Sequence, residues 1–425
     1  MVTLLGVCLT CLAILRVSVD QAVHRIVLSV RSLDPIPNVL NLGQESNLTV
    51  ATWNSNTNIG QRFSDDNQEL QFPCKDRQGS SFGRLEDIFC LRLPPFLPNL
   101  TNPCFYDIDE NMKTKMRCLP YFYILGQSKC GTTDLHGRMM YHPLIRNNKG
   151  VIGKEATFWA WGRFGIYHKM VEGKNRTIEH YLNTFANTAL EIQASLKTSG
   201  KHSQIITGDA SPMDLTGYRG WRHVPHNQGL AEPKVMTPHF MKHLYRGFVP
   251  KFFIQLREPV DRLFSDYVFQ RGGKTPEQFH GHAITALAMI QDCEKNHSRR
   301  WCYYSDELYQ KLPTRIHWSC YSVYIADWFS VYPREAFHVS RIDDLQHDMA
   351  GVMTSVFHFM GVGQPSADVM AEMLKGPRQH TTKAKVGLTV LPKTRLALKD
   401  YVDRCNRETA ALLNDDRFLW KDHVF

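Results

Sequence analysis

Residues 121–133, YFYILGQSKCGTT, combine residue types that bind anions. An apolar run leads into a loop bracketed by two glycines, and a helical pattern follows. A loop of this kind directs several backbone N–H groups and the positive end of the helix dipole at one point, where a phosphate is held. We therefore expect a phosphate site formed by Gly126, Lys129, Cys130, Gly131, Thr132 and Thr133.

The glycine spacing of this loop is that of ATP-binding loops, but its lysine is displaced. Thr132 stands where such NTPases carry lysine, and the only lysine in the loop is Lys129. No aspartate suited to holding Mg²⁺ follows a later strand. The pattern disfavours a kinase or an ATPase, and a strand-to-helix turn without a ligand stays the alternative.

A second candidate element is residues 252–269, FFIQLREPVDRLFSDYVF. Arg257 ends an apolar run and Ser265 follows eight residues later, within the next expected helix. Both side chains can then lie at the carboxyl edge of a sheet, where α/β proteins bind ligands. A guanidinium and a hydroxyl suit a terminal phosphate. The alternative is that Arg257 pairs with Glu258 or Asp261 and that Ser265 faces solvent.

The elements that must position these residues are four short apolar runs, each followed by a turn and a helical pattern. The runs are residues 121–125, 204–207, 252–256 and 336–339. Such units predict an α/β domain with a central parallel sheet flanked by helices. Pro259 suits the first position of a helix, and a last helix is expected from about Pro392.

The two phosphate elements together resemble those of the Golgi sulfotransferases that use 3′-phosphoadenosine 5′-phosphosulfate (PAPS). The matching residues of the second element are Leu256, Arg257, Pro259, Arg262, Ser265 and Tyr267. The resemblance spans residues 118–425 and implies the P-loop-like sulfotransferase fold. It implies that the first loop holds the 5′-phosphosulfate and that Arg257 and Ser265 hold the 3′-phosphate. Lys129 would stabilise charge on the oxygen between phosphate and sulfate, and no metal is expected.

The resemblance also assigns a base for the acceptor hydroxyl. In related enzymes a glutamate after a lysine has this role, and the matching residue is Glu155, next to Lys154. Aromatic neighbours would partly desolvate the carboxylate and raise its proton affinity; a surface Lys154–Glu155 pair is the alternative. A late basic loop over the nucleotide is expected at Lys383, Lys385 and Gly387. Sugar contacts are expected from Lys154, Trp159, Trp161 and Trp221, although core or rim positions suit the tryptophans equally.

The implied function is transfer of a sulfuryl group from PAPS to a hydroxyl of a glycosaminoglycan. The resemblance is strongest to members that act on the 6-hydroxyl of N-acetylgalactosamine 4-sulfate in chondroitin or dermatan sulfate. Ala156 and Thr157 stand where Pro and His are expected, which leaves other acceptors such as heparan sulfate open. A non-catalytic glycosaminoglycan-binding homologue is the other alternative, and nucleic acid is not an expected partner.

Composition and charge agree with a globular protein that meets anions. Hydrophobic residues make up 43% and charged residues 21% of the 425-residue chain, which excludes disordered, collagen-like and polytopic membrane classes. The net charge is +9, but residues 20–120 carry ten Lys/Arg and twelve Asp/Glu. Residues 375–404 carry eight bases and two acids. This late basic segment suits a polyanion, and a solvated helix face is the alternative.

The chain carries signals of the secretory pathway. We expect a signal-anchor or signal peptide at residues 1–19, a luminal stem at 20–73 and the catalytic domain at 74–425. This predicts a single-pass type II protein of the Golgi lumen, or a secreted one if the leader is cleaved. Glycosylation sequons lie at Asn47, Asn99, Asn175 and Asn296. Disulfide candidates are Cys293 and Cys302, with further candidates among Cys74, Cys90, Cys104 and Cys118.

Overall fold

The computed structural model describes residues 72–75, 85–108, 113–165, 176–199, 202–217, 219–378 and 388–421. By its contacts the chain divides into two units, Met1–Asn67 and Gln68–Phe425, and all described residues belong to the second. The expected leader, and the expected stem up to residue 71, lie outside the described residues. None of the helices in the described ranges is long and apolar enough to cross a membrane.

The central sheet has five parallel strands in the order β4-β5-β3-β6-β7. Their bounds are Phe122–Gly126 for β3, Ile145–Arg146 for β4, Ile206–Asp209 for β5, Lys251–Leu256 for β6 and Phe337–Arg341 for β7. Each of the four apolar runs contains or overlaps one strand, so these predictions are confirmed. All five residues of β3 are buried because this strand lies in the middle of the sheet and has helices on both faces.

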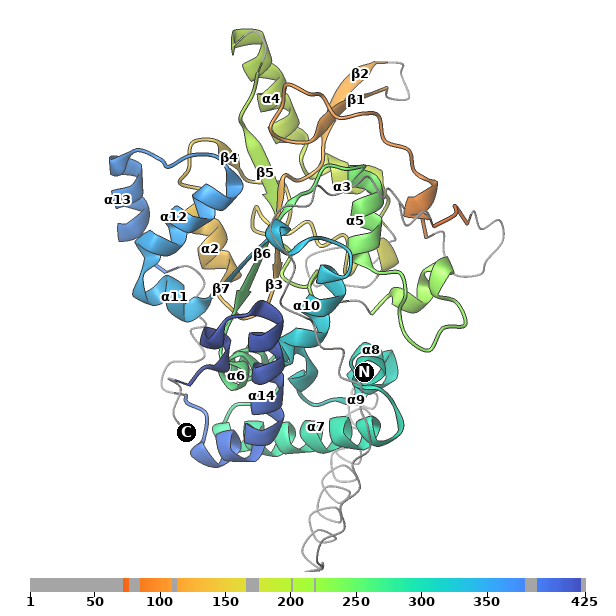
Figure 1. Ribbon diagram of the computed structural model, residues 1–425, viewed down its shortest axis with the longest axis vertical. Coiled ribbons are helices and arrows are strands. Elements are labelled where there is room, and N and C mark those ends of the chain that lie inside the picture. Colours follow the sequence, from red (N-terminus) through yellow and green to blue (C-terminus); the bar gives the residue numbers. More distant parts are fainter. Residues whose placement is uncertain are drawn as a thin grey trace, which may run out of the picture. The chain divides into compact units, whose positions relative to one another are not determined.

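One face of the sheet is covered by four helices, α2, α11, α12 and α13 (Figure 1). These are Thr132–Met139, Ile342–His347, Met349–Met360 and Ala367–Lys375. Phe122, Ile124 and Phe253 point to this face and pack against α2 and α12 residues in one buried cluster. Side chains two apart on a strand share a face, which is why Phe122 and Ile124 belong to the same cluster.

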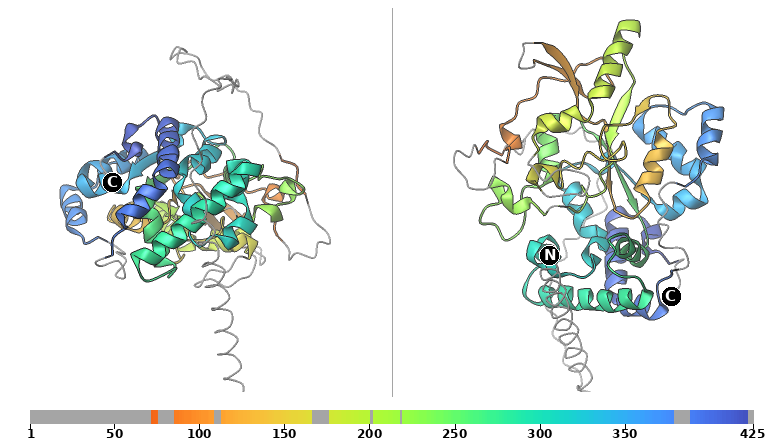
Figure 2. Two further views of the ribbon diagram at one scale, coloured as in Figure 1. Left: turned by 90° about the horizontal axis from the view of Figure 1, so that it is seen from below. Right: turned by 180° about the vertical axis from the view of Figure 1, so that it is seen from behind.

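The other face carries the larger apolar core, with helices α3, α5, α6, α10 and α14 (Figure 2). Their bounds are Ile178–Asn183, Thr237–Tyr245, Pro259–Phe269, Tyr321–Phe329 and Pro392–Leu413. Tyr123, Leu125, Phe252 and Ile254 point into this core, alternating along β3 and β6 with the residues of the first face. Because helices cover both faces of the sheet, a ligand site is expected at the edge of the sheet where the strands end.

The remaining elements extend this framework. They are the antiparallel pair β1 (Cys104–Ile108) and β2 (Thr114–Cys118), and the helices α4 (Ala186–Ser199), α7 (Pro276–Asn296), α8 (Arg299–Tyr304) and α9 (Asp306–Lys311). Helix α7 packs beside α14 (Figures 1 and 2).

Two helix starts follow the sequence expectation. Helix α6 begins at Pro259, and the Glu258 carboxylate caps it by accepting hydrogen bonds from the N–H groups of Val260 and Asp261 at 3.0 and 2.7 Å. Helix α14 begins at Pro392, as expected. Both prolines occupy the first helical turn, where the missing N–H has no partner to lose.

Four disulfides cross-link the described residues. Cys293–Cys302 confirms the predicted pair, and the cysteines near the start of the sheet pair as Cys74–Cys90 and Cys104–Cys118. Cys320–Cys405, 85 residues apart, had no signal in the sequence. Of the four sequons, Asn99 and Asn296 are exposed, whereas Asn47 and Asn175 lie outside the described residues.

Candidate active site

Two glutamines hold the loop between β3 and α2 in shape. The Gln127 N–H donates to the carbonyl of Gln255 on β6 at 2.8 Å, and the Gln127 side-chain amide donates to the Trp318 carbonyl at 3.0 Å. The Gln255 amide donates to the Cys130 carbonyl at 2.6 Å, and the Cys130 N–H donates to the Gln127 carbonyl at 3.1 Å. These bonds use the N–H groups of Gln127 and Cys130, and the Ser128 N–H donates to Gln127 Oε1, so the loop is held by its own backbone while other N–H groups at the start of α2 stay open.

The open donors form a cradle at the start of α2. Lys129 and Gly131 adopt left-handed backbone conformations, with φ of 71° and 81°, and such reversals turn successive N–H groups toward one side. Within the described residues, the N–H groups of Lys129, Gly131, Thr132 and Thr133 donate to no protein acceptor. Four open donors and the positive end of a helix dipole suit a phosphate or sulfate.

The Lys129 ammonium lies beside this cradle. Its Nζ sits 3.8 Å from the ring centroid of Phe269, at the end of α6. Burial lowers the pKa of Lys129, and the nearby Arg257 and Arg262 add to this effect while Asp266 opposes it. The loop lysine therefore lies close to charged groups of the β6–α6 element.

Arg257 lies close to the loop, and Ser265 lies in the helix that follows Arg257. Arg257 follows β6 and Ser265 is buried in α6; Arg257 acts electrostatically on both Lys129 and Cys130. Arg257 Nη2 lies 3.9 Å from Asp261 Oδ2, so the alternative pairing is present, but at the outer limit of an ion pair. The Arg257 side chain is 24% exposed, so it is accessible to a ligand.

Arg262, one turn before Ser265 in α6, has a structural role. It is fully buried, and its Nε donates to Ser319 Oγ at 2.7 Å while Nη2 donates to the Arg315 carbonyl at 3.0 Å. Its Nη1 lies 3.6 Å from Asp266. These contacts fix α6 against the segment 315–319, and so they hold Ser265 in place.

Glu155 does not form a surface pair. The Lys154 ammonium lies 2.6 Å from Glu155 Oε1 and donates to the Ala210 carbonyl at 3.0 Å. The lysine side chain is 1% exposed, whereas that of Glu155 is 19% exposed. A buried cation thus orients one carboxylate oxygen and leaves the other part of the carboxylate reachable from solvent.

Two further acids near Glu155 were not anticipated from the sequence. Asp209 ends β5, and its Oδ1 accepts hydrogen bonds from the Ala156 N–H at 3.1 Å and from Ser211 Oγ at 2.6 Å. Asp214 accepts from the Ala160 N–H at 3.3 Å. Burial is the largest cause that raises the pKa of both carboxyl groups, and the charge of Glu155 contributes to both; the pKa of Asp209 is raised to about 6, and Asp209 adds to the rise at Asp214.

The acidic segment also joins the base to the phosphate loop. The Leu215 N–H donates to the Leu125 carbonyl, at the end of β3, at 2.9 Å. A side chain at Gly126 would come within 3.0 Å of the Pro212 carbonyl. Glycine is therefore needed at this position because the two segments approach closely.

Several expected contacts are placed differently. Trp159 and Trp221 are 0% and 2% exposed, so neither ring has a face open to a sugar, and this placement does not support their expected stacking role. Trp161 is partly exposed. Burial raises the pKa of the Cys130 thiol to about 12, so it stays protonated. The expected late loop of Lys383, Lys385 and Gly387 lies outside the described residues.

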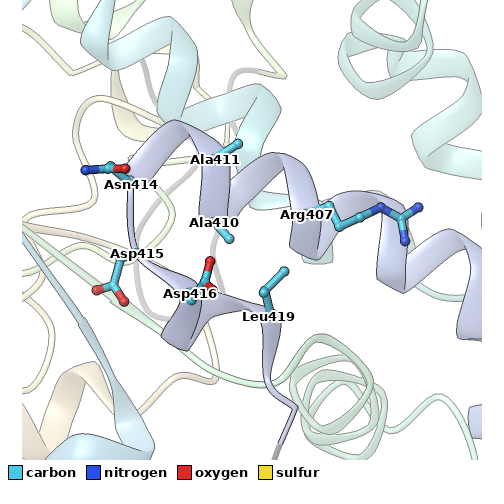
Figure 3. A pocket seen from close by; sticks show the side chains of 7 residues that line it. All are labelled: Arg407, Ala410, Ala411, Asn414, Asp415, Asp416 and Leu419. Carbon is cyan, nitrogen blue, oxygen red and sulfur yellow. The ribbon is translucent and has the colours of Figure 1, made fainter. Parts of the chain in front are cut away.

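A pocket of about 390 Å³ lies at the carboxyl end of α14 (Figure 3). It is lined by Arg407, Ala410, Ala411, Asn414, Asp415, Asp416 and Leu419. None of the residues expected at the site lines this pocket. The chemistry of the two phosphate elements and Glu155 therefore decides the functional assignment.

Known protein families and proteins resemble this chain. Residues 120–386 match the family described as "Sulfotransferase domain". Carbohydrate sulfotransferase 15 of Rattus norvegicus is 33% identical over 319 residues, which are 72% of this chain and 55% of that protein, and the Homo sapiens protein gives the same values. The chain thus spans about half the length of these relatives. A sulfotransferase structure from Alicyclobacillus acidocaldarius is 20% identical with a TM-score of 0.42, covering 70% of this chain and 97% of that one.

Proposed function

This chain belongs to the sulfotransferase domain family, and from that premise we propose that it transfers the sulfuryl group of PAPS to a hydroxyl of a glycosaminoglycan. The observation that carries the proposal is the cradle of four open N–H groups beside Lys129. Its donors suit the 5′-phosphosulfate. Arg257, just after the neighbouring strand β6, and Ser265, in the helix α6 that follows, suit the 3′-phosphate.

Lys129 and Glu155 divide the proposed chemistry. As the acceptor oxygen bonds to sulfur, the bond from sulfur to the bridging oxygen of the donor breaks, and negative charge grows on that oxygen. Lys129 stabilises this charge more in the transition state than in the ground state. Glu155 takes the proton of the acceptor hydroxyl. The products are the sulfated sugar, adenosine 3′,5′-bisphosphate (PAP) and a protonated Glu155, so atoms and charges balance.

The positive charges near the loop also suit the negative charge of PAPS. PAPS is strongly anionic, and Lys129, Arg257, Arg262 and Arg315 lie around the loop and α6. Two of these, Arg262 and Arg315, are partly neutralised by Asp266. Lys129 and Arg257 keep charge available for the ligand.

For the acceptor we propose the 6-hydroxyl of N-acetylgalactosamine 4-sulfate in chondroitin or dermatan sulfate. Two relatives that carry the name carbohydrate sulfotransferase support a sugar acceptor. The basic excess of the late segment supports a polyanionic one. Ala156 and Thr157 follow the proposed base at positions where Pro and His are expected. Heparan sulfate or another hydroxyl is therefore the competing acceptor.

The compartment is part of the same proposal. Four disulfides and two exposed sequons support an oxidising lumen, for which we propose the Golgi, with residues 1–19 as the membrane anchor or signal peptide.

An acceptor panel tests this proposal. The purified chain is incubated with [³⁵S]PAPS and chondroitin, chondroitin 4-sulfate, dermatan sulfate or heparan sulfate, and the labelled disaccharides are then mapped. We expect label on the 6-position of 4-sulfated N-acetylgalactosamine. Label found only in heparan sulfate would mean that heparan sulfate, and not chondroitin or dermatan sulfate, is the acceptor. Retention of the protein on heparin without transfer to any acceptor would favour the non-catalytic alternative.

A further inference from the structure

Asp209 lies at one end of a chain of hydroxyl groups that crosses the larger core. Tyr181 on α3 contacts Asp209 Oδ2 at 3.1 Å, and its hydroxyl lies 3.1 Å from that of Tyr123 on β3. The Tyr123 hydroxyl lies 2.9 Å from that of Tyr245 on α5, which donates to the Pro120 carbonyl at 2.6 Å. All three tyrosines are at most 1% exposed, so water does not complete these contacts.

The number of protons in this chain depends on Asp209. There are four contacts in series, from the carboxyl group to the Pro120 carbonyl, but the three tyrosines supply only three protons. If Asp209 is ionised, one contact lacks a proton. If Asp209 is protonated, it donates to Tyr181, and each hydroxyl donates to the next acceptor. The chain is therefore completed by one further proton on Asp209.

The same carboxyl group holds the segment of the proposed base. Its Oδ1 binds the N–H of Ala156, next to Glu155, and the Ser211 hydroxyl that it binds accepts from the Thr157 N–H at 2.9 Å. Lys154 Nζ links the segments again through Glu155 and the Ala210 carbonyl. Asp209 is thus held between the hydroxyl chain and the backbone that carries Glu155.

We propose that Asp209 is a positioning residue for Glu155, and that it takes up and releases one proton as the charge on Glu155 changes. This inference rests on the proposed role of Glu155 as the base. When Glu155 is ionised, its charge disfavours an ionised Asp209. When Glu155 has taken the acceptor proton, Asp209 can release its own to bulk water. The coupling is reciprocal, so a charge on Asp209 also favours proton uptake by Glu155.

The electrostatic surroundings agree with a titrating group. Burial is the largest cause that raises the pKa of Asp209 to about 6, and the hydrogen bonds from Ser211, Ala156 and Tyr181 oppose it. The titratable and charged groups around Asp209, and around the Lys154 that borders it, are Glu155, Asp214, Tyr181, Tyr123, Tyr245, Lys154 and His136. Among these, burial lowers the pKa of His136 to about 3, so its ring is neutral.

The first test measures unfolding and does not depend on activity. A carboxyl group whose pKa is raised in the folded state stabilises the fold at low pH and loses this contribution as pH rises through about 6. Asp209→Asn keeps the shape, and its amide donates to Tyr181 as a protonated carboxyl does. We expect the variant's Tm, relative to wild type, to rise between about pH 5 and about pH 8. A variant that is less stable by the same amount at every pH overturns the proposal.

The second test uses two tyrosine variants with opposite expected effects on the acid limb of the transfer rate. The acid limb reports the ionised base, Glu155. Tyr181→Phe removes a donor to the ionised Asp209 carboxylate, so Asp209 stays protonated, its charge no longer favours proton uptake by Glu155, and the limb moves down by less than about 1 pH unit. Tyr245→Phe leaves two contacts for two phenolic protons, which an ionised Asp209 satisfies, so the charge of Asp209 favours proton uptake by Glu155 and the limb moves up. Each variant removes one buried hydroxyl, and a purely structural role predicts lower Tm for both without opposite shifts.

Asp209→Asn completes the set. We expect kcat to fall about tenfold while the KM for PAPS changes less than about twofold, because the donor site does not include Asp209. Opposite shifts of the acid limb in the two tyrosine variants, together with the lower kcat and nearly unchanged KM of Asp209→Asn, support the proposal. Equal or absent shifts of the limb overturn it. If wild type transfers no sulfate at all, the proposed function fails, and the pH dependence of Tm still reports on Asp209.

Discussion

Lys129 owes its position to the loop conformation and to one aromatic ring. A left-handed φ of 71° directs its side chain toward α6, where Phe269 lies under the ammonium at 3.8 Å. A cation over a ring keeps its charge while losing part of its water. Phe269 is 57% exposed, so the ammonium is held at the mouth of the cradle rather than enclosed.

Lys129→Ala is predicted to lower kcat for sulfate transfer by about 10²–10³-fold, because one fixed charge at the leaving oxygen is lost. The affinity for PAP should fall less than about tenfold, since the loop N–H groups remain. Kinetics and calorimetry measure the two effects. Lys251→Ala is the matched control, because Lys251 also lies over a ring, that of Phe359, but at the start of β6. An unchanged kcat in Lys129→Ala contradicts the assignment.

At the residue scale, sequence reasoning reached the residues whose motif is local. Lys129, Arg257 and Ser265 stand at fixed spacings from strand ends. Lys129 and Arg257 lie close enough to interact electrostatically, and Ser265 lies buried in α6. Asp209 and Asp214 carry no such signal, because their importance depends on Glu155, more than 50 residues away. Trp159 and Trp221 show the converse, since an aromatic residue near a site is as compatible with the core as with a ligand.

At the scale of elements, the β3–α2 turn depends on the close approach of α11 and β6. A side chain added at Gly131 would lie 2.8 Å from Ile342 Cδ1 and 2.9 Å from the Gln255 amide nitrogen. That amide holds the Cys130 carbonyl. The glycine is therefore required both for its positive φ and for space.

Gly131→Ala is predicted to lower the free energy of unfolding by about 2–4 kcal/mol and to weaken PAP binding more than about tenfold. Gly229→Ala is the matched control, because Gly229 has a similar φ of 75° with nothing within 4 Å of the added atom. It should cost only about 1 kcal/mol and leave PAP binding unchanged. Denaturant unfolding and calorimetry measure both. Equal losses of stability in the two variants would mean that backbone strain alone matters.

The elements were predictable where an apolar run or a helix-starting proline marks them in the sequence. Strand β6 reads as an apolar run, and Pro259 and Pro392 fix the starts of α6 and α14. Strand β4 has only two residues, too short for any periodicity, and the β1–β2 pair alternates weakly. These strands owe their place to neighbours rather than to their own sequence.

On the scale of the whole molecule, disulfides connect segments that no local pattern relates. Cys320 precedes α10 and Cys405 lies within α14, so their bond joins two helices of the larger core across 85 residues. Cys293–Cys302 closes only nine residues, between α7 and α8.

Replacing both Cys320 and Cys405 with alanine is predicted to lower the free energy of unfolding by about 4.6 kcal/mol through chain entropy. The same change at Cys293 and Cys302 should cost about 2.6 kcal/mol, because the closed loop is shorter. Guanidinium unfolding of the two double variants measures the difference. A larger loss at Cys293 and Cys302 would contradict the loop-length argument.

The central claim is that the cradle and Glu155 together form a sulfuryl-transfer site. Its most direct test is a single-turnover measurement of label passing from [³⁵S]PAPS to chondroitin 4-sulfate, with wild type and Glu155→Gln compared at equal occupancy by PAPS. We predict label on the polysaccharide with wild type, and a rate reduced about 10²–10⁴-fold in Glu155→Gln with unchanged PAPS binding. Transfer at the wild-type rate by Glu155→Gln would contradict this account.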